Sequence, residues 1–156
     1  KVAVKLCARN YKFIYLGGHR DQTYHDYLVK TYGDFVDFVG MKENVDEYYK
    51  AADLMLFLSH RESAPTVIFE SMAFSLPIVG WDTVGVNELI INDYNGYCCP
   101  YTKINYVADK VEFILENNEV NKRISNNSHK SFQDNYIFKK HVQRLLFSFK
   151  SLKGGN

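Results

Sequence analysis

The chain has 156 residues, the size of one domain with a substantial core. Apolar residues make up 46%, with 12 tyrosines and 11 phenylalanines, which argues against disorder. Nineteen basic and 18 acidic residues leave a formal charge of +1 without any Lys/Arg block. This balance gives no sign of nucleic-acid binding or of a polybasic membrane patch, so an anionic ligand must be held by local donors.

Short apolar strands alternate with helices along the chain. In chain order we expect strand 12–16, helix 21–32, strand 35–39, helix 44–52, strand 54–58, helix 65–75, strands 77–80 and 96–99, and helices 103–117, 120–135 and 138–152. Helices between strands indicate βαβ units and a parallel sheet. The sequence therefore predicts one Rossmann-like α/β domain over residues 1–156, with a doubly wound parallel sheet flanked by helices.

Two glutamates, Glu62 and Glu70, flank the start of the helix expected at 65–75. They follow the apolar strand 54–58, and open α/β sheets bind their ligands at the carboxyl ends of strands. The free N–H groups at this helix start, on Thr66, Val67 and also Ala64 if Ser63 is the N-cap, favour a phosphate or diphosphate. Pro65 has no N–H. Two acids beside an anion site suit the hydroxyl groups of sugars, because carboxylates accept hydrogen bonds from diols.

Each glutamate also has a structural explanation. Glu62 could satisfy the first-turn amides of the helix, and Glu70 could lie on its solvated face. Against the second explanation, the helix is apolar nearly all round. A buried helix that carries one acid indicates that Glu70 has a polar partner.

The run from Glu62 to Ala73, E-S-A-P-T-V-I-F-E-S-M-A, closely resembles the donor-side motif of retaining glycosyltransferases of family 4, also called group 1. These enzymes have the two-domain GT-B fold. Further matches are Leu76-Pro77-Ile78-Val79, the loop at Gly85 that leads to Glu88-Leu89-Ile90, and Asn95-Gly96. The resemblance covers residues 12–117.

This resemblance implies the C-terminal, donor-binding half of a retaining, metal-independent glycosyltransferase that uses a nucleotide-diphosphate sugar. Such an enzyme would transfer a hexosyl group to a glycan or glycolipid acceptor, as in bacterial polysaccharide synthesis. The implied roles are sugar hydroxyls for Glu62, which is the catalytic-site residue, and ribose hydroxyls for Glu70. The other implied donor-binding residues are Ser63, Ala64, Pro65, Thr66 and Val67 at the diphosphate, Met41 and Lys42 at the base, and Gly17 and Gly18 where the backbone approaches the ligand. A Gly-Gly pair after a strand, such as Gly17-Gly18, is more often a plain turn.

The chain departs from the family pattern in several places. Ala64 and Pro65 replace the usual aromatic residue and glycine, and Ser75 stands where glycine is common. The Arg and Lys that family members carry upstream have no counterpart, because Lys5 and Arg9 lack the expected spacing. The N-terminal acceptor domain is also missing from this sequence. We therefore expect the chain alone to bind donor weakly and to transfer no sugar.

The remaining expectations concern partners and location. The five histidines show no metal-ligand spacing, so no metal or other cofactor is expected. The expected partners are the nucleotide-sugar donor and the missing N-terminal domain. Three cysteines without C-x-x-C spacing indicate reduced core thiols in a cytoplasmic protein. The amphipathic run 136–152 is expected to pack on protein, with peripheral binding at the inner face of the cell membrane as the alternative.

Two other functions stay open at this point. One is the half-domain of a nucleotide-sugar epimerase, which would need acid and base groups from a partner domain. The other is a non-catalytic α/β module of flavodoxin-like topology, which would have no affinity for nucleotides.

Overall fold

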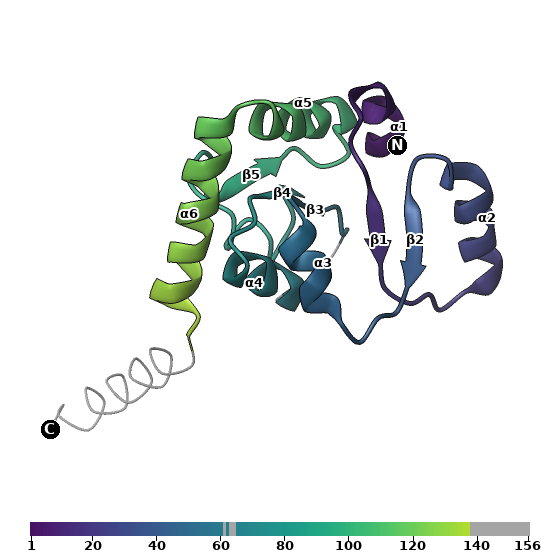
Figure 1. The fold of residues 1–156 in the computed structure, drawn as a ribbon, viewed down its shortest axis with the longest axis horizontal. Helices are drawn as coiled ribbons and strands as arrows, with labels where there is room; N and C mark the ends of the chain where they lie inside the picture. Colours follow the sequence, from purple (N-terminus) through teal and green to yellow (C-terminus); the bar gives the residue numbers. More distant parts are fainter. Residues whose placement is uncertain (61, 63–64, 138–156) are drawn as a thin grey trace, which may run out of the picture.

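The computed structural model describes residues 1–60, 62 and 65–137. Its elements follow the expected alternation of strand and helix (Figure 1). They are α1 (Val2–Leu6), the 3-10 turn η1 (Cys7–Arg9), β1 (Ile14–Leu16), α2 (Gln22–Tyr32), β2 (Asp37–Gly40), α3 (Val45–Ala51), β3 (Met55–Phe57), α4 (Thr66–Ala73), β4 (Ile78–Trp81), β5 (Gly96–Cys99), α5 (Ile104–Leu115) and α6 (Asn118–Asn135). The five expected strands and the expected helices up to residue 135 are confirmed. The helix expected at 138–152 lies outside the described residues, and the sequence did not predict α1 or η1.

All strand pairs are parallel, which confirms the fold class. β1 pairs with β2, with Tyr15 opposite Phe38. β4 lies between β3 and β5, with Val79 opposite both Leu56 and Tyr97. One feature differs from the expected continuous sheet. The strands form two sheets, of order β1-β2 and β3-β4-β5, and no ladder of described residues joins β1 to β3.

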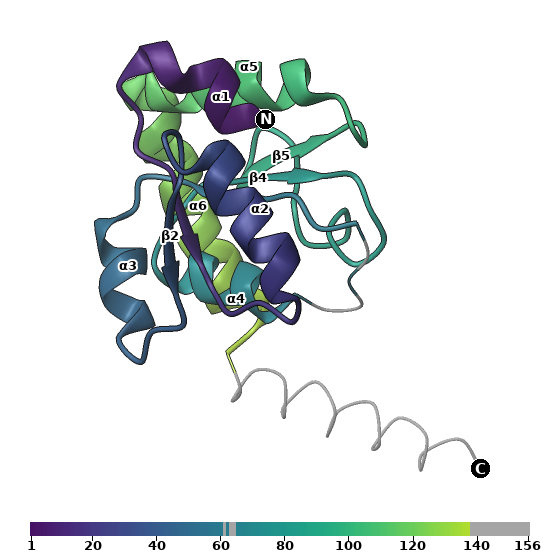
Figure 2. The ribbon, with the colours of Figure 1, turned by 90° about the vertical axis from the view of Figure 1, so that its right-hand side faces the viewer.

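Helices cover both faces of the larger sheet, because successive residues of a strand point to opposite faces. On one face Val79 and Cys99 pack with α5 and with Val2 and Leu6 of α1. On the other face Ile78 packs with Ile68 and Met72 of α4. Figure 2 shows α1 and α5 on one side of β4 and β5, and α4 on the other. This two-sided covering is what makes the domain doubly wound.

The cysteines follow the same alternation. Cys99 is buried in the cluster under α5, and Cys98 packs against the cluster under α4. Burial raises the pKa of the Cys98 thiol to about 11 and that of Cys99 to about 12, so both stay protonated. Cys7 is exposed, so the expectation of a core thiol is wrong there. It lies in η1, where the structure leaves its side chain outside the core.

The helix starts agree partly with the sequence. Asn44 lies at the N-cap of α3 as expected, but its side chain makes no capping bond and instead donates to the Glu47 carboxylate. α4 begins at Thr66, with Pro65 at the N-cap position. After this helix Ser75 has a φ of 63°, a left-handed conformation that explains why glycine is common at this position in the family motif.

The Asn-Gly pair at the start of β5 fixes the preceding loop. The Asn95 side chain is buried; its Nδ2 donates to the Leu89 carbonyl at 2.9 Å, and its Oδ1 accepts from the Ile91 amide at 2.7 Å. A Cβ atom on Gly96 would overlap the backbone carbonyl of Ile78 in β4. Only glycine therefore lets β5 approach β4 this closely.

Replacing Gly96 tests this close approach. We expect Gly96→Ala to lower the free energy of unfolding by about 3 kcal/mol, because the backbone of β4 cannot move away without breaking its ladder. Gly40→Ala is the matched control, since Gly40 has a φ of 70° with nothing within 4 Å of an added Cβ. That control should lose only about 1 kcal/mol, the cost of a left-handed alanine. Urea unfolding measures both, and equal losses would contradict the close approach.

Candidate functional site

The loop after β3 places Glu62 at the carboxyl end of the larger sheet. Ser59 Oγ donates to Glu62 Oε1 at 3.1 Å, and the Glu62 side chain is exposed. The carboxylate is thus held by its own loop. Because the Glu62 side chain is exposed, a ligand hydroxyl can reach its carboxylate.

Glu70 has the polar partner that the sequence indicated. The Tyr49 hydroxyl, from α3, donates to Glu70 Oε2 at 2.8 Å. The Tyr49 ring stacks on Phe74, with ring centroids 5.3 Å apart and planes at 13°. Burial, followed by the hydrogen bond to Glu70 and its charge, raises the pKa of Tyr49 well above its usual value. Tyr49 therefore stays protonated and fixes one oxygen of an exposed carboxylate.

The start of α4 supplies backbone donors between the two acids. Within the described part of the chain, the amides of Thr66 and Val67 have no acceptor, whereas the Ile68 amide bonds to the Pro65 carbonyl at 3.0 Å. Thr66 is exposed and Pro65 is buried. The predicted site residues Ser63 and Ala64 lie outside the described residues. The N–H groups at the start of a helix point out of its N-terminal end, so the first turn of α4 is a place where an anion can bind.

The loops after β1 and β2 form a second group of predicted residues. Gly17 N donates to the Gly40 carbonyl at 3.0 Å, and Gly17 has a φ of 146° that favours glycine. A Cβ added to Gly18 would lie 3.0 Å from Met41 Sδ, so the Met41 side chain lies beside Gly18. Met41 is 82% exposed and Lys42 is exposed. The structure therefore brings Gly17, Gly18 and Met41 together. The hydrogen bonds from Ser59 to Glu62 and from Tyr49 to Glu70 belong to a different group of residues.

An aromatic cluster at the carboxyl ends of β3, β4 and β5 was not predicted as a unit. Its members are His60, Trp81 and Tyr101, with ring centroids 5.1 to 5.5 Å apart and edge-to-face angles of 72–73°. The His60 Nδ1 and the Tyr101 hydroxyl are in hydrogen-bond contact. Trp81 Nε1 is buried and has no hydrogen-bond partner among residues 1–60, 62 and 65–137. The sequence signal that could have indicated this cluster is the single tryptophan directly after the expected strand 77–80.

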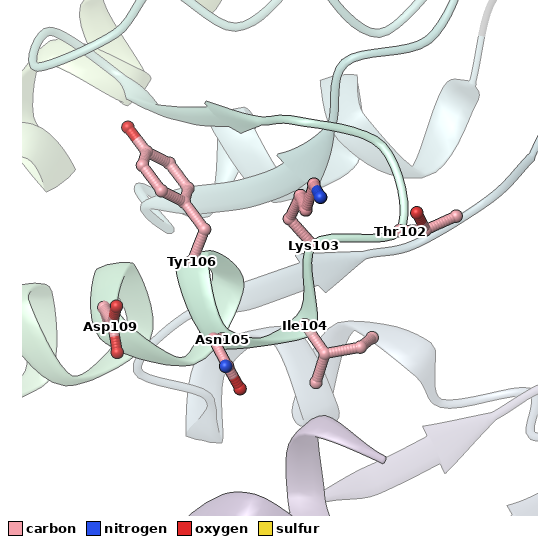
Figure 3. A pocket seen from close by; sticks show the side chains of 6 residues that line it. All are labelled: Thr102, Lys103, Ile104, Asn105, Tyr106 and Asp109. Carbon is pink, nitrogen blue, oxygen red and sulfur yellow. The ribbon is translucent and has the colours of Figure 1, made fainter.

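Three other features of the described residues add nothing to the candidate site. A search of residues 1–60, 62 and 65–137 finds no group of three or more His, Cys, Asp or Glu side chains placed to hold a metal ion. In the same part of the chain no helix has the length and apolarity needed to cross a bilayer. An open hollow at the start of α5, lined by Thr102, Lys103, Ile104, Asn105, Tyr106 and Asp109, includes none of the predicted residues (Figure 3).

Similarity to known proteins identifies the family of this chain. Residues 1–131 match the family described as glycosyl transferases group 1, and the chain belongs to this family. It is 32% identical over 111 residues to the N-acetyl-alpha-D-glucosaminyl L-malate synthase of Bacillus anthracis. That match covers 71% of this chain but only 29% of the relative, so the chain spans less than a third of that protein.

Solved structures show the same fold. The Anabaena protein Alr3699/HepE, in complex with UDP and glucose, superposes with a TM-score of 0.83 at 19% identity, covering 96% of this chain and 44% of that one. The C-terminal domain of a group 1 glycosyl transferase family protein from Francisella tularensis gives a TM-score of 0.76 at 19% identity, covering 88% of this chain and 77% of that one. The chain thus has the fold of a glycosyltransferase domain.

The Tyr49–Glu70 pair predicts a pH effect. Because the native state holds the Tyr49 proton more tightly than the unfolded state, its contribution to stability is complete below pH 10 and is lost as the pH rises above it. The difference in unfolding free energy between the chain and Tyr49→Phe should therefore be constant below pH 10 and shrink above it. Urea unfolding from pH 8 to 11 measures this difference.

A second variant separates the causes. Glu70→Gln removes the charge that faces the Tyr49 hydroxyl but leaves the burial of its ring, so it should reduce the alkaline loss only partly. A difference between the chain and Tyr49→Phe that does not depend on pH would contradict the raised pKa of Tyr49.

Proposed function

We propose that this chain is the nucleotide-sugar donor-binding domain of a retaining, metal-independent glycosyltransferase. The reaction is transfer of a hexosyl group to a glycan or glycolipid acceptor. The observation that carries the proposal is the arrangement around the start of α4, where two exposed carboxylates flank backbone amides that lack an acceptor among the described residues. Family membership and a structural neighbour solved with UDP and glucose support it.

The two carboxylates divide the donor between them. Glu62, exposed in the loop after β3, accepts hydrogen bonds from hydroxyls of the sugar. Glu70 uses the oxygen that Tyr49 leaves free to accept from the ribose hydroxyls. Charge-assisted hydrogen bonds of this kind are strong and directional. Both residues bind and orient the donor, and neither is assigned the role of a nucleophile or of a general acid.

The diphosphate and the base are bound mainly by neutral groups of the chain. The amides of Thr66 and Val67 donate to the diphosphate at the positive end of the α4 dipole. The neighbouring residues Gly18 and Met41 offer an apolar surface for the base, beside Lys42. In this arrangement fixed backbone donors stabilise the charge of the departing diphosphate, which is why the proposal needs no metal ion.

Transfer requires more than this site. A glycosyl transfer needs a site that excludes water on all sides, whereas Glu62, Glu70 and Met41 are all exposed here. We therefore assign the acceptor, the closing surface and the remaining charge stabilisation to a second domain of the enzyme. Such an enzyme works in the cytoplasm, and with a glycolipid acceptor it lies peripherally at the inner face of the membrane.

Calorimetric titration with UDP, GDP and ADP tests the nucleotide part and identifies the base. We expect weak binding of one of them, and Glu70→Gln should weaken it about 10-fold or more, because a hydrogen bond to a charged group contributes roughly 1.5–3 kcal/mol. Glu119→Gln, an exposed change in the first turn of α6, is the matched control and should have no effect. The absence of binding for all three nucleotides would overturn the proposal.

A deoxynucleotide makes the Glu70 test specific. The wild-type chain should prefer the ribonucleoside diphosphate over its 2′-deoxy form, and Glu70→Gln should remove most of that preference. An unchanged preference would remove Glu70 from the ribose site while leaving nucleotide binding intact.

Glu62→Gln tests the sugar part. It should leave the affinity for the nucleoside diphosphate unchanged and remove the additional affinity for the nucleotide sugar, because Glu62 contacts only the sugar. The 156-residue chain, supplied with donor and acceptor, should show no transfer. Measurable transfer by this chain alone would contradict the role assigned to a second domain.

A further inference from the structure

The aromatic cluster of His60, Trp81 and Tyr101 has no role in the function proposed above. Trp81 is the last residue of β4, His60 follows β3, and Tyr101 follows β5. Because β4 pairs in parallel with both β3 and β5, the carboxyl ends of the three strands lie side by side. The cluster therefore lies at the ligand-binding edge of the larger sheet, and His60 is on the same loop as Glu62.

The contact between His60 and Tyr101 decides which nitrogen of the imidazole carries the proton. His60 Nδ1 and the Tyr101 hydroxyl are in hydrogen-bond contact. A phenol hydroxyl is the better donor of this pair and a neutral imidazole nitrogen the better acceptor, so the hydroxyl donates to Nδ1. The proton of the neutral ring is then on Nε2, which points away from Tyr101. Since His60 is exposed, this N–H group is open to a ligand.

Trp81 contributes a second ring N–H group. Its side chain is only 9% exposed, and its Nε1 atom has no acceptor within residues 1–60, 62 and 65–137. A buried donor without an acceptor costs free energy, which an acceptor bound at the cluster would recover. The cluster thus combines two N–H donors, on His60 and Trp81, with an Nδ1 acceptor that Tyr101 already occupies.

The same cluster also presents aromatic carbon. The three rings pack edge to face, with centroids 5.1 to 5.5 Å apart, and Tyr101 is 42% exposed. A ligand group that fits here has an acceptor oxygen next to an apolar part. A sugar hydroxyl lacks the apolar part, and a sugar carboxylate would be repelled by the charge of Glu62 on the same loop. An acetamido group has both, a carbonyl oxygen with two lone pairs and a methyl group.

We propose that His60 is a specificity-determining residue of the sugar subsite and that the donor sugar it selects carries an acetamido group. This inference rests on the proposed function, in which Glu62 binds hydroxyls of the same sugar. His60 Nε2–H donates to the acetamido carbonyl, and the methyl group packs on the exposed part of the Tyr101 ring. Trp81 is a positioning residue, because its indole packs against both of the other rings.

Sugar 1-phosphates test the sugar subsite without a nucleotide. NMR titration of the 156-residue chain compares N-acetylglucosamine 1-phosphate with glucose 1-phosphate, and N-acetylgalactosamine 1-phosphate with galactose 1-phosphate. In at least one pair the acetamido sugar should bind about tenfold more tightly, because it adds a hydrogen bond and a buried methyl group. Glu62→Gln should weaken both members of that pair alike.

Equal affinity within both pairs, or no binding of any of the four compounds, overturns the inference. Neither result decides the proposed function, which depends on the separate titration with nucleoside diphosphates. The two proposals can therefore fail independently of each other.

Variants of His60 test its role in the preference. His60→Phe keeps an aromatic ring but has no N–H group, so it should remove most of the preference for the acetamido sugar. His60→Gln has an amide donor and should restore part of it. His19→Phe, at an exposed histidine in the loop after β1, is the matched control and should leave the preference unchanged. A preference that survives in His60→Phe removes His60 from the sugar subsite.

Tyr101→Phe tests how His60 is positioned. At pH 8, where an ordinary histidine is neutral, the ¹⁵N chemical shifts of the imidazole distinguish the two tautomers. The wild-type chain should hold the His60 proton on Nε2, whereas the variant should populate both tautomers and lose several-fold in preference. A wild-type proton on Nδ1, or a variant with unchanged tautomer and preference, contradicts this role of Tyr101 and overturns the inference.

Discussion

Parallel pairing of the strands is the constraint on which the rest of this structure depends. Parallel neighbours must be connected by a crossover, so each strand returns to the same end of the sheet before the next begins. The loops after β1 and β2 therefore open at one edge of the smaller sheet, and the loops after β3 and β4 open at one edge of the larger sheet. Every residue of the candidate site lies on such a loop or on the helix that follows it.

At the edge of the larger sheet, beside α4, the chain combines hydrogen-bond acceptors from side chains with hydrogen-bond donors from the backbone. The acceptors are the carboxylates of Glu62 and Glu70, and the donors are backbone amides of the first turn of α4. A hydroxyl-rich ligand with a central anion is complementary to this order, whereas a simple anion or a cation satisfies only part of it. The pattern of charge therefore specifies the class of ligand more sharply than the net charge of the chain does.

The sequence predicted local structure well because apolar runs and glycines report it directly. The pattern of apolar and polar positions is enough to predict the strand 54–58 and the helix after Pro65. It also predicts that Glu70 has a polar partner. The identity of that partner does not follow, since Tyr49 reaches Glu70 only through the packing of α3 near α4. The division of the sheet and the cluster of His60, Trp81 and Tyr101 likewise depend on strand pairing between distant segments.

The aromatic cluster has a practical consequence. Trp81 is the only tryptophan of the chain, and it lies at the carboxyl end of β4 with an indole N–H that has no partner in the part of the chain that the structure describes. Indole emission responds to the polarity of its surroundings and to hydrogen bonding at the ring nitrogen. The protein thus carries a single intrinsic fluorophore at the edge where its ligand is proposed to bind, and occupancy there can be followed by light without any label.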